Sequence, residues 1–187
     1  MPIVASKESD AKGRDLADFD SVMREHQRRI YRFLYAMLRD SDDANTLTQE
    51  CFLRAFRNWS SFRGESSVAT WLTRIAVNLV KDHRRDRRLA FWRRLFASDD
   101  RADLKTISES QPALRSDPER EILAKEKASA IWKMVEKLPM QQRAVFTLRF
   151  AEEMSICEIA LAMQLEQGTV KSHLSRALST VRKIGNG

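Results

Sequence analysis

Glycine and proline are scarce in this sequence, with five and four copies among 187 residues. Long runs of Ala, Leu, Arg, Lys and Glu fill the chain instead, and no segment alternates apolar and polar residues as a half-buried strand does. Sheets need turns, and turns depend on residues such as glycine and proline, so their scarcity argues against a β protein. The composition therefore predicts an all-α fold.

Cysteine and histidine are scarce as well. Cys51 and Cys157 lie far apart inside helical patterns without a CxxC spacing, and the three histidines show no metal-ligand spacing. We expect both cysteines to be small buried residues in a reducing compartment, and we expect neither a metal nor a cofactor. Phosphate-loop, nucleophile-elbow and HExxH motifs are also absent, which argues against an enzyme.

The chain lacks 18 consecutive apolar residues, and residues 1–19 contain no apolar core of signal-peptide length. We therefore expect a cytoplasmic protein without an export signal. Charge is unbalanced, with 33 Lys and Arg residues against 26 Asp and Glu, a formal net charge of +7. Such an excess favours a polyanionic partner such as nucleic acid, although a basic soluble protein without one would carry the same charge.

Apolar residues at helical spacing predict three antiparallel helices within residues 19–96, enough for a self-sufficient bundle after a disordered tail of residues 1–18. The first helix is expected to end at residues 39–42, and Ser66 or Ser67 is expected to cap the third. The second helix carries a stripe that we expect to be buried: Ala44, Leu47, Cys51, Phe52, Ala55, Phe56 and Trp59.

A change in charge pattern predicts a domain boundary. Residues 81–94 contain seven cations and two acids, whereas residues 97–116 are acidic and lack apolar periodicity, as in a flexible linker. A second small domain of four helices, residues 117–187, is expected to follow. Its third helix opens with a capping-box sequence, Ser155 and Glu158, and its last two helices fit a helix-turn-helix.

The last helix has one basic face, opposite an apolar stripe that contains Val170 and Leu178. The basic face carries Lys171, Ser172, Ser175, Arg176, Ser179, Arg182 and Lys183. Cations can bind phosphates or the acceptor edge of guanine, and short serines let a helix enter the major groove. A solvated amphipathic helix is the alternative.

Aromatic residues bracket the basic segment 81–94. Cations beside aromatic rings suit single-stranded DNA, whose bases stack on such rings. Trp71 is expected in the core, whereas Phe62, in a loop, is the better candidate for a base contact. The alternative is a solvated helix end whose cations interact with the helix dipole.

Two series of short sequence motifs resemble conserved regions 2 and 4 of the extracytoplasmic-function sigma factors. The motifs for region 2 are residues 47–56, 62–66 and 70–78, and those for region 4 are residues 138–139, 142–143, 148–150, 158–160 and 168–172. They cover most of residues 19–184 in family order and leave no room for a region 3. The resemblance implies a bacterial sigma factor that binds RNA polymerase core, recognises promoters and helps melt DNA.

The resemblance assigns residues to four surfaces. Binding of the clamp of the largest polymerase subunit would involve Asp43, Leu47, Gln49, Glu50 and Leu53. Recognition and melting of the −10 element would involve Phe62, Arg63, Ser67, Thr70, Asn78, Lys81, Arg84, Arg85 and Arg88. Recognition of the −35 element would involve Arg149 (on phosphate), Thr169, Lys171, Ser172, His173, Ser175 and Arg176. Residues 138–145 would lie on the flap of the second-largest subunit.

Two positions depart from the family pattern. Gln164 or Glu166 stands where glycine is common in the helix-turn-helix bend, so we expect backbone strain there. His173 stands where arginine is common, which puts its DNA contact in doubt. The resemblance also implies an anti-sigma factor as a partner, and a membrane-anchored one would hold the protein at the inner membrane.

The residues alone leave two other functions open. A helix-turn-helix regulator that never binds polymerase would leave the sequence motif at residues 47–54 unexplained. An adaptor that binds only proteins is disfavoured by the basic face of the last helix. Copurification with core polymerase separates the sigma factor from both alternatives.

Overall fold

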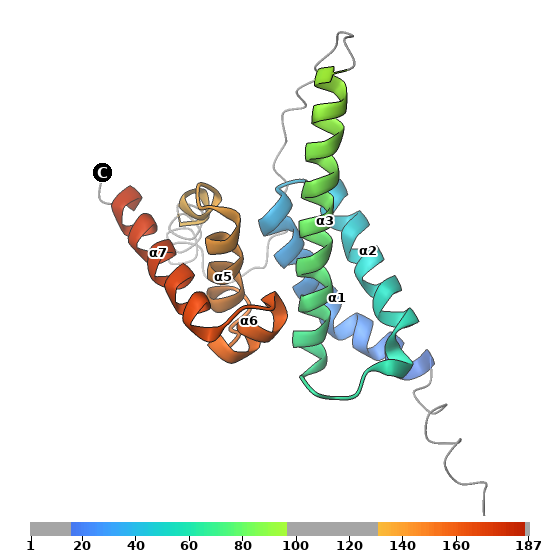
Figure 1. Ribbon diagram of the computed structural model, residues 1–187. Helices are drawn as coiled ribbons and strands as arrows, with labels where there is room; N and C mark the ends of the chain where they lie inside the picture. Colours follow the sequence, from blue (N-terminus) through green and yellow to red (C-terminus); the bar gives the residue numbers. More distant parts are fainter. Residues whose placement is uncertain (1–15, 97–130, 186–187) are drawn as a thin grey trace, which may run out of the picture.

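The structure of the protein, a computed structural model, describes residues 16–96 and 131–185, and the regular elements in these ranges are all helical (Figure 1). Its elements are α1 (Leu16–Leu38), α2 (Ser41–Arg57), the 3₁₀ turn η1 (Trp59–Ser61), α3 (Val68–Phe96), a short helical stretch at 131–136, α5 (Met140–Phe150), α6 (Ile156–Met163) and α7 (Gln167–Gly185). The two-part all-α architecture is as predicted. The expected linker, residues 97–116, and the start of the second domain at residue 117 lie outside the described residues.

Helices α1, α2 and α3 form the N-terminal bundle. Their contact faces meet around Leu34 and Leu72, both fully buried. The carboxylate of Asp40 caps α2 by accepting the backbone N–H groups of Asp42 and Asp43, each at 2.9 Å. Of the two serines expected to cap α3, Ser67 does so, since its hydroxyl accepts the N–H of Thr70 at 3.1 Å. Side-chain caps of this kind stabilise a helix because the backbone N–H groups of its first turn have no intrahelical hydrogen-bond partner.

The prediction of a buried stripe on α2 is wrong at Phe56, whose side chain is 44% exposed. Phe56 lies at the rim of the bundle, where its ring packs edge-on against Phe19 with centroids 5.3 Å apart. Helix α2 ends one residue later, at Arg57, and part of the ring remains accessible in the part of the chain that the structure describes. Leu53, outside the expected stripe, is also 44% exposed.

The capping box predicted at the start of the third helix of the C-terminal module is present in α6. The Ser155 hydroxyl accepts the N–H of Glu158, and the Glu158 carboxylate accepts the N–H of Ser155 at 2.9 Å. These hydrogen bonds hold the pKa of Glu158 below its ordinary value. At the other end of α6, Gln164 adopts a left-handed conformation with φ 57°. The strain predicted for the bend therefore falls on Gln164.

The two cysteines differ in burial. Cys51 is fully buried, and burial raises the pKa of its thiol to about 12. Cys157 is exposed, so the expectation that both cysteines are buried is wrong for this one. The inner face of α6 is formed by Ile159, Ala160 and Met163, which turns Cys157 outward.

The two modules pack against each other. Helix α6 lies on α3, and α5 lies on α1 (Figure 1). Buried residues of both modules form one continuous apolar cluster. Among the described residues, no helix is long and apolar enough to cross a membrane, and no cluster of metal-ligating side chains occurs.

Ser155→Ala is expected to lower the free energy of unfolding by about 1 kcal/mol, because it leaves an amide at the start of α6 without its cap. Urea denaturation followed by circular dichroism measures this change. Cys157→Ala is the matched control, since it alters an exposed side chain two positions later and should change stability by less than about 0.5 kcal/mol. Equal effects of the two substitutions would contradict a stabilising role for the cap.

Candidate nucleic-acid interface

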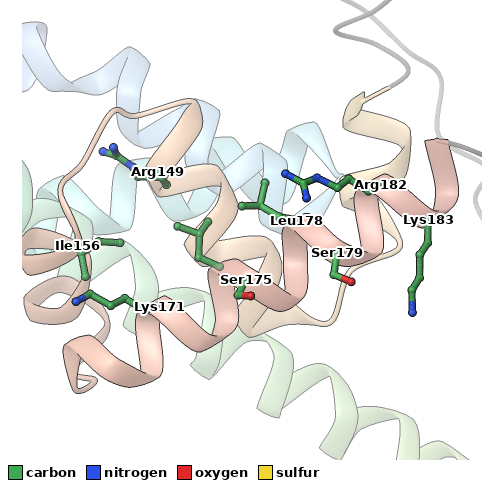
Figure 2. Close-up of a pocket in the computed structure, with 9 residues that line it drawn as sticks. Arg149, Ile156, Lys171, Ser175, Leu178, Ser179, Arg182 and Lys183 are labelled. Carbon is green, nitrogen blue, oxygen red and sulfur yellow. The ribbon is translucent and has the colours of Figure 1, made fainter.

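An open hollow of about 1010 Å³ runs along one side of α7 (Figure 2). Its lining comprises Arg149, Ile156, Lys171, Leu174, Ser175, Leu178, Ser179, Arg182 and Lys183. Four of these residues are cations, two are serines and none is acidic. A concave surface with this charge attracts a polyanion, and its hydroxyl groups and cations can hydrogen-bond phosphate oxygens or base edges.

Arg149 reaches the hollow from the end of α5. Its Nη1 donates to the carbonyl oxygen of Met154 at 3.0 Å, which ties α5 to the segment that leads into α6. The side chain is nevertheless exposed and forms part of the lining of the hollow. This guanidinium is therefore positioned by the fold while its remaining donors can contact an anion.

The hollow gathers three of the seven residues expected at the −35 surface: Arg149, Lys171 and Ser175. The other four lie on α7 outside its lining. Thr169, Ser172 and Arg176 are exposed, and the Ser172 hydroxyl donates to the carbonyl of Gly168 at 2.9 Å. His173 is half-buried, with no hydrogen-bond partner for its buried Nδ1 among the described residues.

The hollow also contains an apolar wall that the sequence reading did not assign to it. Helical spacing predicts that Leu178 lies on the apolar stripe of the last helix, yet it forms this wall together with Ile156 and Leu174. All three are only partly buried and form part of the lining. Their position at the edge of the small core, which periodicity does not report, leaves them accessible.

A second hollow, of about 380 Å³, lies at the loop before α3. It is lined by Ser61, Phe62, Arg63, Glu65, Ser66, Thr70, Trp71, Arg74 and Leu161. Three expected −10 residues meet here, namely Phe62, Arg63 and Thr70. The Phe62 ring packs against Trp71, with centroids 5.0 Å apart. Arg74 was not among the expected residues, although it follows Thr70 by one helical turn.

The remaining −10 candidates do not line this hollow. Ser67 is exposed, and its hydroxyl lies 2.8 Å from that of Thr70. Further along α3, Asn78 and Lys81 are half-buried, whereas the three arginines that follow are exposed: Arg84, Arg85 and Arg88. Arg85 is paired with Asp82 at 3.2 Å. These residues form a basic end of α3 rather than part of the hollow.

The expected polymerase-binding residues divide into accessible and engaged side chains. Gln49 and Leu53 are exposed on α2, and Leu47 is half-buried against the core. Glu50 is paired with Arg54 at 2.6 Å. Asp43 faces α3, where its Oδ2 lies 3.1 Å from His83 Nε2 and 3.3 Å from Arg87 Nη1.

Comparison with known proteins assigns both modules. Residues 22–90 match the family Sigma-70 region 2, and residues 128–181 match Sigma-70, region 4. The RNA polymerase sigma-H factor of Pseudomonas aeruginosa is 34% identical over 171 residues, 90% of this chain and 86% of that protein. The ECF RNA polymerase sigma-E factor of Escherichia coli K12 is 38% identical over 143 residues, 75% of this chain and 73% of that protein.

Two solved structures share the fold. The sigma factor RpoE of Bartonella quintana, crystallised with the anti-sigma factor NepR, superposes with a TM-score of 0.73 at 19% identity, covering 91% of this chain and 98% of that one. CnrH, in complex with the cytosolic domain of CnrY, gives a TM-score of 0.64 at 16% identity, covering 95% and 94%. At these identities the likeness shows the fold alone.

The matches to both regions follow the order in which the two modules occur, and the relatives are matched over most of their length. Sigma factors direct RNA polymerase to promoters and start transcription, and they are initiation factors rather than enzymes. The chain belongs to the extracytoplasmic-function sigma factors of RNA polymerase.

Proposed function

We propose that promoter recognition and polymerase binding are divided among four surfaces of this sigma factor. In residues 19–96, α2 binds the polymerase clamp, while the loop before α3 and α3 itself read and melt the −10 element. In residues 117–187, α7 reads the −35 element and residues 138–145 lie on the polymerase flap. Residues 97–116 link the two modules.

The hollow along α7 is the observation that carries the proposal. Cations from α5 and α7 line it, and no acidic residue is part of its lining. A helix-turn-helix places its second helix in the major groove, and the N-terminal residues of that helix contact base edges. Thr169, Lys171 and Ser172 occupy this part of α7, and Arg149 beside them suits a phosphate.

The smaller hollow supports the −10 assignment. The half-buried ring of Phe62, packed against the buried Trp71, offers a surface on which an unstacked base can lie, and Arg63 supplies charge for the DNA backbone. Exposed arginines on α3 continue the positive surface beyond it. A single strand could therefore follow α3 from this hollow toward its basic end.

An anti-sigma factor is the other proposed partner. One solved structure of the same fold contains a sigma factor bound to the anti-sigma factor NepR, and another contains CnrH bound to the cytosolic domain of CnrY. Such a partner would act on this chain in the cytoplasm, or at the inner membrane if it is anchored there.

Run-off transcription with purified core polymerase tests the proposal. A promoter fragment selected from genomic DNA by the reconstituted holoenzyme serves as template, and variants of its −35 and −10 elements serve as a panel. The protein should convert core enzyme to promoter-specific initiation, with strong dependence on both elements. Sequence-specific DNA binding without any core-dependent transcript would contradict the proposal.

Gln49→Ala combined with Leu53→Ala is expected to weaken binding to core polymerase while the helical fold stays intact. Both side chains are exposed on α2, so their loss removes contact area without opening a cavity. Titration of labelled protein with core polymerase measures the affinity, and circular dichroism checks the fold. Ser60→Ala, exposed but outside α2, is the control; equal affinity of all three proteins would refute the assignment.

A further inference from the structure

A third hollow, of about 300 Å³, lies between α1 and α2 in the N-terminal bundle. Four of its lining residues lie on α1 and three on α2, each set at helical spacing, so that two rows of side chains surround it. The lining comprises Arg24, Gln27, Arg28, Tyr31, Asn45, Thr48 and Gln49. Of these residues only Gln49 belongs to a proposed functional surface.

Most polar groups around this hollow are available to a ligand. Thr48 is the exception, since it is buried and its hydroxyl donates to the carbonyl oxygen of Ala44 at 2.6 Å. The three amide side chains, the Arg28 guanidinium and the Tyr31 hydroxyl form no hydrogen bond or ion pair with another described residue. Amides both donate and accept, and a guanidinium group offers five donors. A ligand can therefore bind here without breaking a hydrogen bond within the protein.

The hollow is positively charged. Arg24 and Arg28 lie one turn apart on α1, and no acidic residue is part of the lining. Arg24 pairs with Asp20 at 2.5 Å, but its side chain is 79% exposed, and ion pairs of this kind contribute little in water. Two guanidinium groups at this spacing suit a dianion such as a phosphate monoester, which they bind by charge-assisted hydrogen bonds.

The volume and the remaining groups indicate what this phosphate is attached to. About 300 Å³ is at the lower end of the range for small-molecule pockets and exceeds the space that a phosphate alone fills. Tyr31 is half-buried, and its ring stacks on that of Tyr35 with centroids 6.1 Å apart, which holds it in place. Aromatic rings and amides are the groups that recognise nucleobases, by stacking and by paired hydrogen bonds to base edges.

We propose that this hollow is a binding site for a nucleoside monophosphate. Arg24 and Arg28 bind the phosphate, Tyr31 contacts the base, and the three amide side chains bind the edge of the base. Adenine is the base with which Asn and Gln pair bidentately, so an adenine nucleotide is expected. The site is argued from the hollow alone and does not depend on the proposed function.

Occupation of the hollow regulates polymerase binding. Gln49 lines the hollow and also belongs to the proposed clamp surface, so the nucleotide and the clamp compete for it. This consequence rests on the proposed function. Because linkage is reciprocal, the nucleotide and core polymerase each lower the apparent affinity for the other by the same factor.

Titration of the full chain with adenosine monophosphate tests the site, and adenosine and inorganic phosphate serve as the two partial ligands. Isothermal titration calorimetry gives the affinities, and amide proton–nitrogen correlation spectra of labelled protein give the location. The monophosphate should bind at least about tenfold more tightly than either partial ligand, because its two parts bind together. Its largest chemical-shift changes should fall within residues 24–31 and 45–49.

Arg28→Ala should weaken binding of the monophosphate by about tenfold or more, since a hydrogen bond to a charged group is lost. Arg57→Ala is the matched control, because it removes the same charge from an exposed residue at the end of α2 that forms no ion pair with a described residue. The two variants have equal net charge, so weak nucleotide binding elsewhere on this basic protein is matched. Asn45→Ala should weaken binding of the monophosphate but not of inorganic phosphate.

Equal affinities of Arg28→Ala and Arg57→Ala for the monophosphate would overturn the site, as would chemical-shift changes confined to α7 and the basic end of α3. Equal affinities of the unmodified protein for the monophosphate and for inorganic phosphate would show a site for any anion and would overturn the nucleotide assignment. Circular dichroism checks that the variants fold, which is expected because all three altered side chains are exposed.

Titration with core polymerase tests the competition separately. Monophosphate at about ten times its Kd should lower the apparent core affinity of the unmodified protein and of Arg57→Ala by about tenfold, and that of Arg28→Ala by about twofold at most. An unchanged core affinity of the unmodified protein would overturn the competition. Failure to bind core without any nucleotide would instead contradict the proposed function.

Discussion

Leu72→Ala is expected to lower the free energy of unfolding by about 2–5 kcal/mol, the range for truncating a fully buried leucine. Leu72 is 0% exposed on α3, and its backbone carbonyl lies 3.6 Å from the Cys51 sulfur of α2. The substitution removes apolar contacts and leaves a cavity where the helices of the bundle meet. Because whole domains are stable by only about 5–15 kcal/mol, this is a large fraction of the total.

Leu89→Ala is the matched control for that experiment. It makes the same chemical change on the same helix, but Leu89 is 46% exposed. Urea denaturation followed by circular dichroism should therefore place it within about 0.5 kcal/mol of the unmodified protein. If Leu72→Ala behaved in the same way, the packing of α3 against α2 described above would be incorrect.

Arg176→Ala is expected to lower transcription from a cognate promoter strongly while leaving the affinity for core polymerase unchanged. Arg176 is exposed on α7, one turn beyond Ser172, and no described contact depends on it. Loss of a base contact should cost about 1–3 kcal/mol and relax preference at one −35 position. Loss of a phosphate contact would instead weaken all sequences alike and reduce the salt dependence.

Run-off transcription over a panel of −35 variants at two salt concentrations separates these outcomes. Lys183→Ala removes a cation from the far end of the same helix and should have a much smaller effect, since recognition helices contact bases near their N-terminal end. Activity of Arg176→Ala equal to that of the unmodified protein on every variant would show that this face of α7 does not read DNA.

Local chemistry made much of this fold predictable. Helical spacing indicated the helices, and the side chains that cap them are chemically distinctive. Ser67 caps α3, Ser155 and Glu158 form the capping box of α6, and Gln164 takes the left-handed bend where the family pattern has glycine. Each of these features depends on residues within four positions of one another, which is the range that a sequence pattern reports directly.

The sequence did not predict features that depend on tertiary packing. The outward orientation of Cys157 and the rim position of Phe56 depend on where neighbouring helices stop. The burial of Glu152 depends on arginines about 120 positions away, and neither segment carries a periodic signal for the pairing. The candidate sites divide in the same way. The basic and serine residues of α7 could be predicted from the sequence, whereas the two hollows could not, because residues from separate helices and loops line them.

Asp43 shows how α2 and the basic end of α3 are energetically linked. Its carboxylate satisfies Arg87 and lies beside His83, so a polymerase group that draws Asp43 away leaves both side chains available to another anion. Binding at two linked sites is reciprocal, so each ligand changes the affinity for the other by the same factor. An anion bound at Arg87 therefore makes Asp43 easier to withdraw. Under the proposed assignment of Asp43 to polymerase binding, core polymerase and DNA phosphate would then strengthen each other's binding through one shared carboxylate.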